Sequence, residues 1–128
     1  MYWLDGGTRT IEVMRLSDTQ QRLVLVHTDL DRPTDLVVDP NNGYLYWSDK
    51  GSDPRIERCR LDGSEREVVI DSSNVIEGKT TREPQGLAFD HEFEKLYFCD
   101  NYNNRIVKVR MYYTLYSAVA LFIFMFLV

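Results

Sequence analysis

Short runs of alternating residues, separated by turn-forming residues, dominate the first 111 positions of the chain. In "YLYWSD" (44–49), alternate side chains fall on opposite faces of a strand, so Trp47 lies on one face and Tyr46 on the other. Two large aromatic residues in succession fit a sheet that is buried on both sides. The final residue of this run, Asp49, is an acid at the end of the predicted strand.

The segment 35–71 predicts four short strands. The predicted strands cover residues 35–39, 44–49, 55–61 and 67–71, and the turns between them read "PNNG", "KGSDP" and "DGSE". The next strands come only after a polar linker, "SSNVIEGKTTREPQ". One structural unit therefore contains four strands, and a second unit begins near residue 84.

The units repeat in sequence. Residues 32–49 align without a gap on residues 83–100, with 6 identical positions among 18, and "YWLD" (2–5) supplies a third copy of the last four positions. The residues after each copy also match: "IEVMRLSDT", "IERCRLDGS" and "IVKVRM" begin at Ile11, Ile56 and Ile106. The spacing is 44 and then 51 residues, counted between the motif tyrosines. Four strands at such a period are typical of a β-propeller blade.

The repeated motif is interpreted as structural. An acid that recurs once in every repeat indicates architecture instead of a single reaction centre, and it can accept backbone N–H bonds from a neighbouring turn or blade. No motif for a nucleophile and base, a phosphate loop or a metal centre is present, so no catalytic, cofactor-binding or metal-binding residue is predicted. The motif residues are Tyr2, Trp3 and Asp5; Tyr46, Trp47 and Asp49; and Tyr97, Phe98 and Asp100.

These residues resemble the YWTD repeat, or class B repeat, of the low-density lipoprotein receptor family. The resemblance covers 1 to about 111, with Phe98 in place of the motif tryptophan. It implies a six-bladed propeller, which at this period requires about 264 residues. The expected fold is therefore all-β: a partial propeller of about two and a half blades over residues 1–111, with an apolar C-terminal helix over 112–128.

The resemblance also implies a function. It indicates a non-catalytic ligand-binding and scaffolding module on the extracellular face of the cell surface, in a receptor-related protein of the endocytic or Wnt co-receptor type. A structural matrix protein of the nidogen type is the alternative. Members bind protein ligands over loops at one end of the propeller, so Asp49, Asp53 and Tyr102 are candidate contacts for a basic protein, with simple solvated turns as the competing interpretation.

The net charge, the cysteines, the histidines and the clustered acids limit which partners and sites are expected. The net charge is −5 and the basic residues form no stripe, which argues against nucleic acid as a partner. Cys59 and Cys99 leave three alternatives open: buried free thiols, one disulfide, or a reactive cysteine. His27 and His91 are expected at the surface. The acids in "DLDRPTD" (29–35) and "DPNNG" (39–43) are attributed to turn chemistry, with a calcium site as the alternative.

The segment 112–128, "YYTLYSAVALFIFMFLV", is uncharged. As a helix it would span about 25 Å, slightly less than a hydrocarbon core of about 30 Å. This composition leads to three hypotheses: a sequence foreign to the fold, a membrane anchor, or a helix that covers the open end of the partial propeller. The first residues, "MYWLDGGTRT", lack the apolar region of a signal peptide.

Overall fold

The structure is a computed structural model, and it describes residues 1–111 of the chain. The described part is all-β, and every strand pairing is antiparallel. The elements are β1 (Tyr2–Asp5), β2 (Thr10–Arg15), β3 (Asp18–Val26), β4 (Pro33–Asp39), β5 (Tyr44–Asp49), β6 (Arg55–Arg60), β7 (Glu67–Ile70), β8 (Val75–Ile76), β9 (Lys79–Thr80), β10 (Pro84–Asp90), β11 (Lys95–Asp100), the 3-10 helix η1 (Asn101–Asn103) and β12 (Arg105–Arg110).

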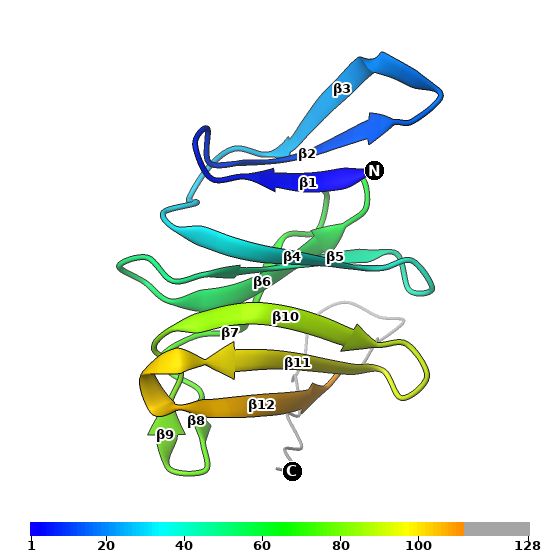
Figure 1. The fold of residues 1–128 in the computed structure, drawn as a ribbon. Coiled ribbons are helices and arrows are strands. Elements are labelled where there is room, and N and C mark those ends of the chain that lie inside the picture. The colour runs from blue at the N-terminus through cyan, green and yellow to red at the C-terminus, as the bar shows by residue number, and fades with distance from the viewer. Residues whose placement is uncertain (112–128) are drawn as a thin grey trace.

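Three sheets stack one over another in chain order (Figure 1). Sheet one has the order β1-β2-β3, sheet two β4-β5-β6-β7 and sheet three β10-β11-β12, and β8 and β9 form a separate hairpin. Sheet two has four strands, whereas the described residues of sheets one and three form three strands each. Sheet one has counterparts of β5, β6 and β7, whereas sheet three has counterparts of β4, β5 and β6.

The strands predicted from the pattern are present. The four predicted strands of the central repeat correspond to β4 to β7, and only their ends differ, by one or two residues. The polar linker, in contrast, is not a plain loop. It contains the hairpin β8–β9, whose turn places Glu77 and Gly78 at φ 49° and 73°, the left-handed conformation of a two-residue hairpin turn.

Two apolar cores separate the three sheets. Leu45 and Trp47 belong to the core between sheets one and two, while Tyr44 and Tyr46 belong to the core between sheets two and three. All six residues of β5 are buried. Burying one large apolar side chain contributes about 1.5–3 kcal/mol. Because β5 has such side chains on both faces, it stabilises the packing of sheet two on sheet one and on sheet three, as the alternation of "YLYWSD" predicts.

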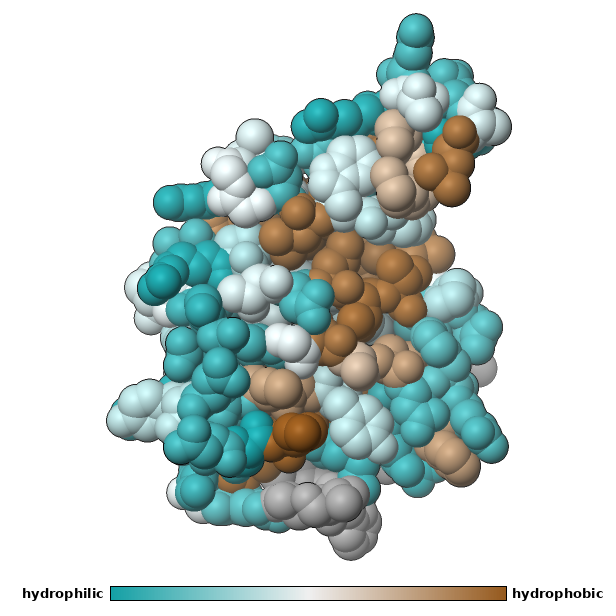
Figure 2. All heavy atoms as spheres, in the orientation of Figure 1, coloured by the Kyte–Doolittle hydropathy of each residue, from teal (hydrophilic) through white to brown (hydrophobic). Residues whose placement is uncertain are grey.

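The first strands of sheets two and three lie side by side. β10 lies against β4, and β1 lies against β4 from the other side (Figure 1). Both β4 and β10 have a bulge near their start, between Pro33 and Asp35 and, one residue later in the repeat, between Gln85 and Leu87. In the same view, apolar atoms reach the surface over the middle of the stack and on the hairpin of β2 and β3 (Figure 2).

The apolar C-terminal helix predicted for 112–128 lies outside the described residues. The one helix within residues 1–111 is η1, a single turn of 3 residues. Over this range, no helix has the length and apolar character needed to cross a membrane.

Candidate functional site

The aspartate at the end of β5 is buried and holds the connection from sheet one to sheet two. Asp49 is fully buried, and it accepts hydrogen bonds from the backbone N–H groups of Asp31 (2.8 Å) and Arg32 (2.9 Å). It also accepts one from Gly51 (2.8 Å) in the loop after β5. Since hydrogen bonds to charged groups each contribute about 1.5–3 kcal/mol, Asp49 fixes both segments at one end of the stack.

Asp100 has the corresponding role at the end of β11. It is fully buried, and the backbone N–H groups of Arg82 and Glu83 lie 3.5 and 3.4 Å from its carboxylate. It also accepts hydrogen bonds from the side chains of Asn103 (2.6 Å) and Arg105 (3.1 Å). The connection into sheet three is therefore held in the same way as the connection into sheet two.

Asp5 is the third motif aspartate, and it holds its own loop. Its carboxylate accepts hydrogen bonds from the backbone N–H groups of Gly7 (2.8 Å) and Thr8 (3.0 Å). These hydrogen bonds, led by that of Thr8, lower the pKa of Asp5. The strands β1, β5 and β11 all finish on one side of the stack, which we call the aspartate end. It comprises the three motif aspartates, the loops 6–9, 50–54 and 101–104, and the connections 27–32 and 81–83.

The three candidate ligand contacts differ in accessibility. Asp49 has no exposed surface, and three backbone N–H groups occupy its oxygens, so its contacts here are with the protein's own loops. Asp53 lies in the loop after β5 with 70% of its side chain exposed. Tyr102 lies in η1, after β11, and is 59% exposed. Asp53 and Tyr102 thus lie at the aspartate end, on neighbouring sheets.

Tyr102 is held in place by an arginine from the preceding connection. The Arg82 guanidinium lies 4.7 Å from the ring centroid of Tyr102 and donates a hydrogen bond of 3.0 Å to its hydroxyl. A cation over an aromatic face at an exposed site contributes about 0.5–1 kcal/mol. The ring is therefore an oriented aromatic group on an otherwise polar end, which is the kind of side chain that anchors protein interfaces.

Two further exposed carboxylates lie at the aspartate end. Asp31 lies 3.9 Å from Arg9, and Glu83 lies 3.9 Å from Lys50; their side chains are 43% and 41% exposed. The backbone N–H of Ser52 lowers the pKa of Asp31. Because exposed ion pairs contribute only about 0–1 kcal/mol, both carboxylates can exchange their present partners for an incoming cation at small cost.

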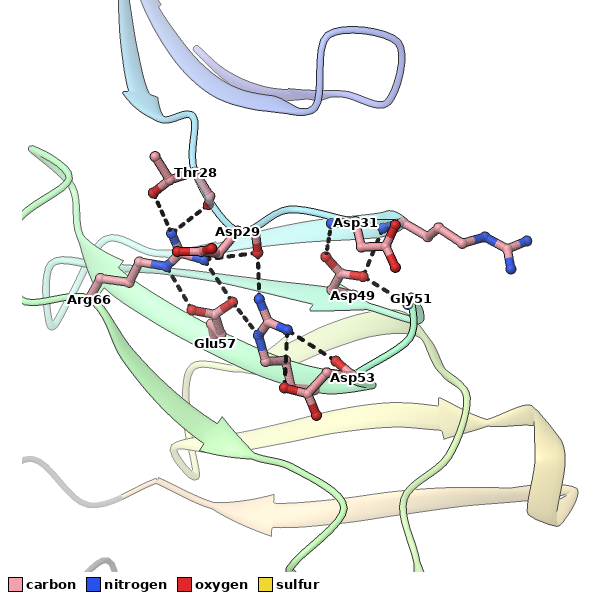
Figure 3. A network of polar contacts seen from close by, with 10 residues as sticks. Thr28, Asp29, Asp31, Asp49, Gly51, Asp53, Glu57 and Arg66 are labelled. Atoms are coloured by element: carbon pink, nitrogen blue, oxygen red, sulfur yellow. Dashed lines mark hydrogen bonds and ion pairs between the residues drawn. The ribbon is translucent and has the colours of Figure 1, made fainter.

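A buried charge network lies behind the loop that carries Asp53 (Figure 3). Glu57 is 4% exposed and receives hydrogen bonds from Arg55 (2.8 Å) and from Arg66 (2.7 and 2.9 Å). The Arg66 guanidinium lies 5.4 Å from the ring centroid of Trp47. Both arginines also donate to the carbonyl of Asp29, so they tie sheet two to the preceding connection. A shallow surface depression of about 610 Å³ lies beside this network.

Sheet one contains the same combination of side chains. Trp3 is the cross-strand partner of Glu12, as Trp47 is of Glu57. Arg22 lies 5.5 Å from the ring centroid of Trp3, and its hydrogen bond to Glu12, of 2.7 Å, lowers the pKa of that carboxyl. The motif tryptophan is therefore one member of a tryptophan–glutamate–arginine unit. The two arginines are equivalent, since each lies two residues before the valine that pairs with the glutamate, Val24 or Val68. Sequence reasoning missed the unit because the alignment from Ile11 and Ile56 displaces the arginines by one residue.

In sheet three, the partner of the motif aromatic changes together with the aromatic itself. Phe98 faces Val107 across the strands, at the positions that tryptophan and glutamate occupy in the other sheets. Both residues are buried, at 1% and 3% exposure. The departure from the tryptophan motif is thus accompanied by loss of the buried carboxylate, which keeps sheet three free of an unpaired buried charge at this position.

The motif tyrosines mark one face of each sheet. The Tyr2 hydroxyl donates a hydrogen bond of 3.3 Å to the carbonyl of Leu61, which reaches from sheet one to sheet two. Tyr46 stacks on Phe89, with ring centroids 5.4 Å apart, which joins sheet two to sheet three. Tyr97 is half-buried on the corresponding face of sheet three.

Both cysteines are free thiols. Cys59 is fully buried between sheets one and two, whereas Cys99 is half-buried on sheet three. Burial raises the pKa of the Cys59 thiol to about 11.

The two histidines are exposed as expected, and His91 lies 3.7 Å from the buried carboxylate of Asp39.

The turn aspartates accept backbone hydrogen bonds. Asp31 accepts one from Ser52 (2.8 Å), and Asp39 accepts one from Asn42 (3.3 Å). The Asp39 contact is local and is that expected of turn chemistry, whereas Asp31 joins the connection 27–32 to the loop 50–54.

The sequence matches the family Low-density lipoprotein receptor repeat class B over residues 1–40 and 43–91. The chain belongs to this family. It is 36% identical over 106 residues to the human Low-density lipoprotein receptor-related protein 5-like protein, which covers 83% of this chain and 39% of that protein. It is also similar to a chain in a crystal structure of a nidogen/laminin complex, with a TM-score of 0.73, 32% identity and coverage of 84% of this chain and 38% of that chain. The chain thus spans less than half the length of either match.

Proposed function

We propose that residues 1–111 form part of a six-bladed YWTD propeller that acts as a non-catalytic, protein-binding module, with 112–128 as a separate apolar segment. Family membership and similarity to a known propeller chain support the fold assignment. A low-density lipoprotein receptor-related protein among the relatives supports an extracellular, cell-surface setting. The ligand would bind at the aspartate end.

One observation carries this proposal: exposed binding groups stand on loops that buried aspartates hold rigid. Asp53 and Tyr102 are largely exposed, while Asp49 and Asp100 beneath them are fully buried and hydrogen-bonded. Loops that are already ordered lose little conformational entropy on binding, which favours affinity. The expected partner is a basic protein, because Asp53 and the two carboxylates at 31 and 83 remain exposed beside an aromatic anchor.

The test uses a lysine-rich synthetic peptide as the probe and its glutamate counterpart as a negative control. We expect Asp53→Lys and Tyr102→Ala each to weaken binding of the lysine peptide by about tenfold, as for a contact worth about 1.4 kcal/mol. The matched controls Glu92→Lys and Phe93→Ala change the same kinds of side chain in the turn after β10, at the opposite end of the stack. Equal losses for all four variants, or none, would reject the aspartate end as the binding surface.

The cellular role depends on the type of parent protein. We favour a receptor of the endocytic or Wnt co-receptor type, since a receptor-related protein is among the relatives. A structural matrix protein of the nidogen type is the second candidate, although similarity to a chain in a nidogen/laminin complex supports the shared fold and does not favour this role over the receptor. Surface labelling of cells that express the full-length protein distinguishes the two: retention on the cell indicates the receptor, and release into the matrix indicates the alternative.

A further inference from the structure

The connection from sheet two to sheet three contains an element that the connection from sheet one to sheet two does not. The second repeat spacing is 51 residues and the first is 44. The additional length lies in the polar linker and forms the hairpin β8–β9, beside the start of β12 (Figure 1). Residues 27–32, at the corresponding place, contain no strand. Because Ile76 of the hairpin is 1% exposed and belongs to the core between sheets two and three, the hairpin is a packed part of the fold.

One arginine holds both strands of this hairpin. The Arg105 guanidinium donates hydrogen bonds to the backbone carbonyls of Ile76 in β8 (2.7 Å) and Lys79 in β9 (3.3 Å). It also donates one to the motif aspartate Asp100 (3.1 Å), and its side chain is only 10% exposed. A guanidinium has several donors in a fixed plane, so a single side chain can hold three acceptors at once.

The same position of the repeat has the same role in sheet two. Arg55 and Arg105 each precede the isoleucine that begins a repeat copy, and each is the cross-strand partner of the motif aspartate of its sheet. Arg55 donates a hydrogen bond to the carbonyl of Asp29 in the connection 27–32. An arginine at this position therefore holds the connection that enters its own sheet, and in sheet three that connection includes the hairpin.

The hairpin leads directly to the residue that orients the aromatic anchor. Asn103 in η1, next to Tyr102, donates a hydrogen bond of 2.8 Å to the carbonyl of Thr80 in β9. Two residues after Thr80, the Arg82 guanidinium lies over the Tyr102 ring and donates a hydrogen bond to its hydroxyl. The hairpin with its following residues and the loop of η1 thus hold each other at two points next to Tyr102.

The motif aspartate holds this connection less closely than its counterpart in sheet two does. The N–H groups of Arg82 and Glu83 lie 3.5 and 3.4 Å from Asp100. The corresponding distances at Asp49 are 2.8 and 2.9 Å. Thr81 is fully buried, and its hydroxyl has no hydrogen-bond partner among the described residues, which costs stability. The position of Arg82 therefore depends more on the hairpin than on Asp100.

We propose that Arg105 is a positioning residue of the aspartate end: by holding the hairpin β8–β9, it fixes Arg82 and thereby the orientation of the Tyr102 ring. This inference rests on the proposed function, because it assigns Arg105 to the support of a ligand contact. The Arg105 side chain is itself almost enclosed, so it acts through Tyr102 and not by touching the ligand. An oriented side chain loses less conformational entropy on binding than a free one.

Fluorine NMR of the full chain labelled with fluorotyrosine reports the orientation of Tyr102 without any ligand. The Tyr102 resonance is the one that is absent from Tyr102→Phe. We expect Arg105→Lys to shift or broaden it, because one ammonium group does not span the three acceptors. Asn103→Ala removes the other side-chain bond to the hairpin and should change the same resonance. Arg55→Lys is the matched control, since it affects the connection 27–32.

Circular dichroism establishes that each variant is folded. A Tyr102 resonance that Arg105→Lys and Asn103→Ala leave unchanged would overturn the proposal. So would an equal change in Arg55→Lys.

Amide hydrogen exchange locates the effect along the chain. Arg105→Lys should speed exchange in residues 75–83 and leave 27–32 unchanged, whereas Arg55→Lys should do the reverse. Faster exchange in both segments from either variant would mean a general loss of stability instead of a local positioning role, and would overturn the proposal.

Binding of the lysine-rich peptide tests the route through Tyr102. We expect Arg105→Lys to weaken binding by no more than the loss of about tenfold expected of Tyr102→Ala. The double variant should bind as weakly as Tyr102→Ala alone, because the arginine then has no anchor to position. Losses that add would give Arg105 an effect of its own and would overturn the proposal. A wild type that does not bind the peptide would reject the proposed function, while the fluorine spectra and the amide exchange would still decide whether Arg105 positions Tyr102.

Discussion

The carboxylate of Asp35 in β4 accepts a hydrogen bond of 2.7 Å from the backbone N–H of Leu87 in β10. Its other oxygen accepts the N–H of Leu36, at 2.9 Å. The bond crosses from sheet two to sheet three at the point where both first strands have a bulge. The bulge in β10 would leave the backbone N–H of Leu87 without a partner in its own sheet, and Asp35 of sheet two supplies the acceptor.

Replacement of Asp35 by alanine tests this junction. We expect Asp35→Ala to lower the free energy of unfolding by about 1–3 kcal/mol, because the N–H of Leu87 would remain without its acceptor. Urea denaturation measures the change. Glu92→Ala, at an exposed position, should change stability by less than about 0.5 kcal/mol; an equal effect of the two substitutions would contradict the assigned role of Asp35.

Two of the motif aspartates, Asp49 and Asp5, should differ in their contribution to stability. Asp49→Ala leaves three backbone N–H groups without an acceptor inside the protein, so we expect a loss of at least about 3 kcal/mol. Asp5 is not fully buried and serves two N–H groups of its own loop, so Asp5→Ala should cost less. Urea denaturation of the two variants ranks them, and the reverse order would show that the motif aspartates do not act through these hydrogen bonds.

The tryptophan–glutamate–arginine unit should behave as one group. Glu57→Val alone leaves Arg55 and Arg66 without their buried carboxylate, and we expect it to cost about 3–5 kcal/mol. The double variant Glu57→Val with Arg66→Leu resembles the apolar pair of sheet three and should recover part of this loss. A double-mutant cycle measures the coupling. Additive effects within about 0.5 kcal/mol would mean that the two side chains act independently.

Burial of Cys59 predicts a loss of stability at alkaline pH. The folded pKa is raised from 9.0 to about 11, so the thiol ionises first in the unfolded chain. The contribution is complete below pH 9.0 and is lost as the pH rises through about 11. Between about pH 8 and about pH 10, the wild type should lose about 1 kcal/mol more than Cys59→Val. Identical pH profiles for the two proteins would contradict the shift.

Much of the fold could be predicted from local patterns. The alternation in "YLYWSD" indicates a strand buried on both faces, and the structure divides its side chains between two cores. The turn residues placed the four strands of sheet two to within one or two residues. The hairpin β8–β9 was missed because its two-residue strands are too short to show a period, although "EG" at its turn was an available signal.

The site was less predictable because exposure depends on tertiary contacts. Asp49 and Asp53 lie in one acidic stretch, yet backbone donors from residues 31 and 32 bury the first, while the second remains exposed. Nothing in the local sequence distinguishes them. Arg22 and Arg66 reach equivalent tryptophans from equivalent positions. They were missed because the strands before them are 45 residues apart, which displaces the arginines by one residue in the alignment.

The central claim is that the aspartate end is a preordered protein-binding surface. Hydrogen–deuterium exchange of the full chain, with and without the lysine-rich peptide, tests it most directly. We predict slower exchange on binding in the loops 50–54 and 101–104, with no change in the turns 40–43 and 91–94 at the opposite end. Protection confined to the opposite turns, or no protection at saturating peptide, would contradict the claim.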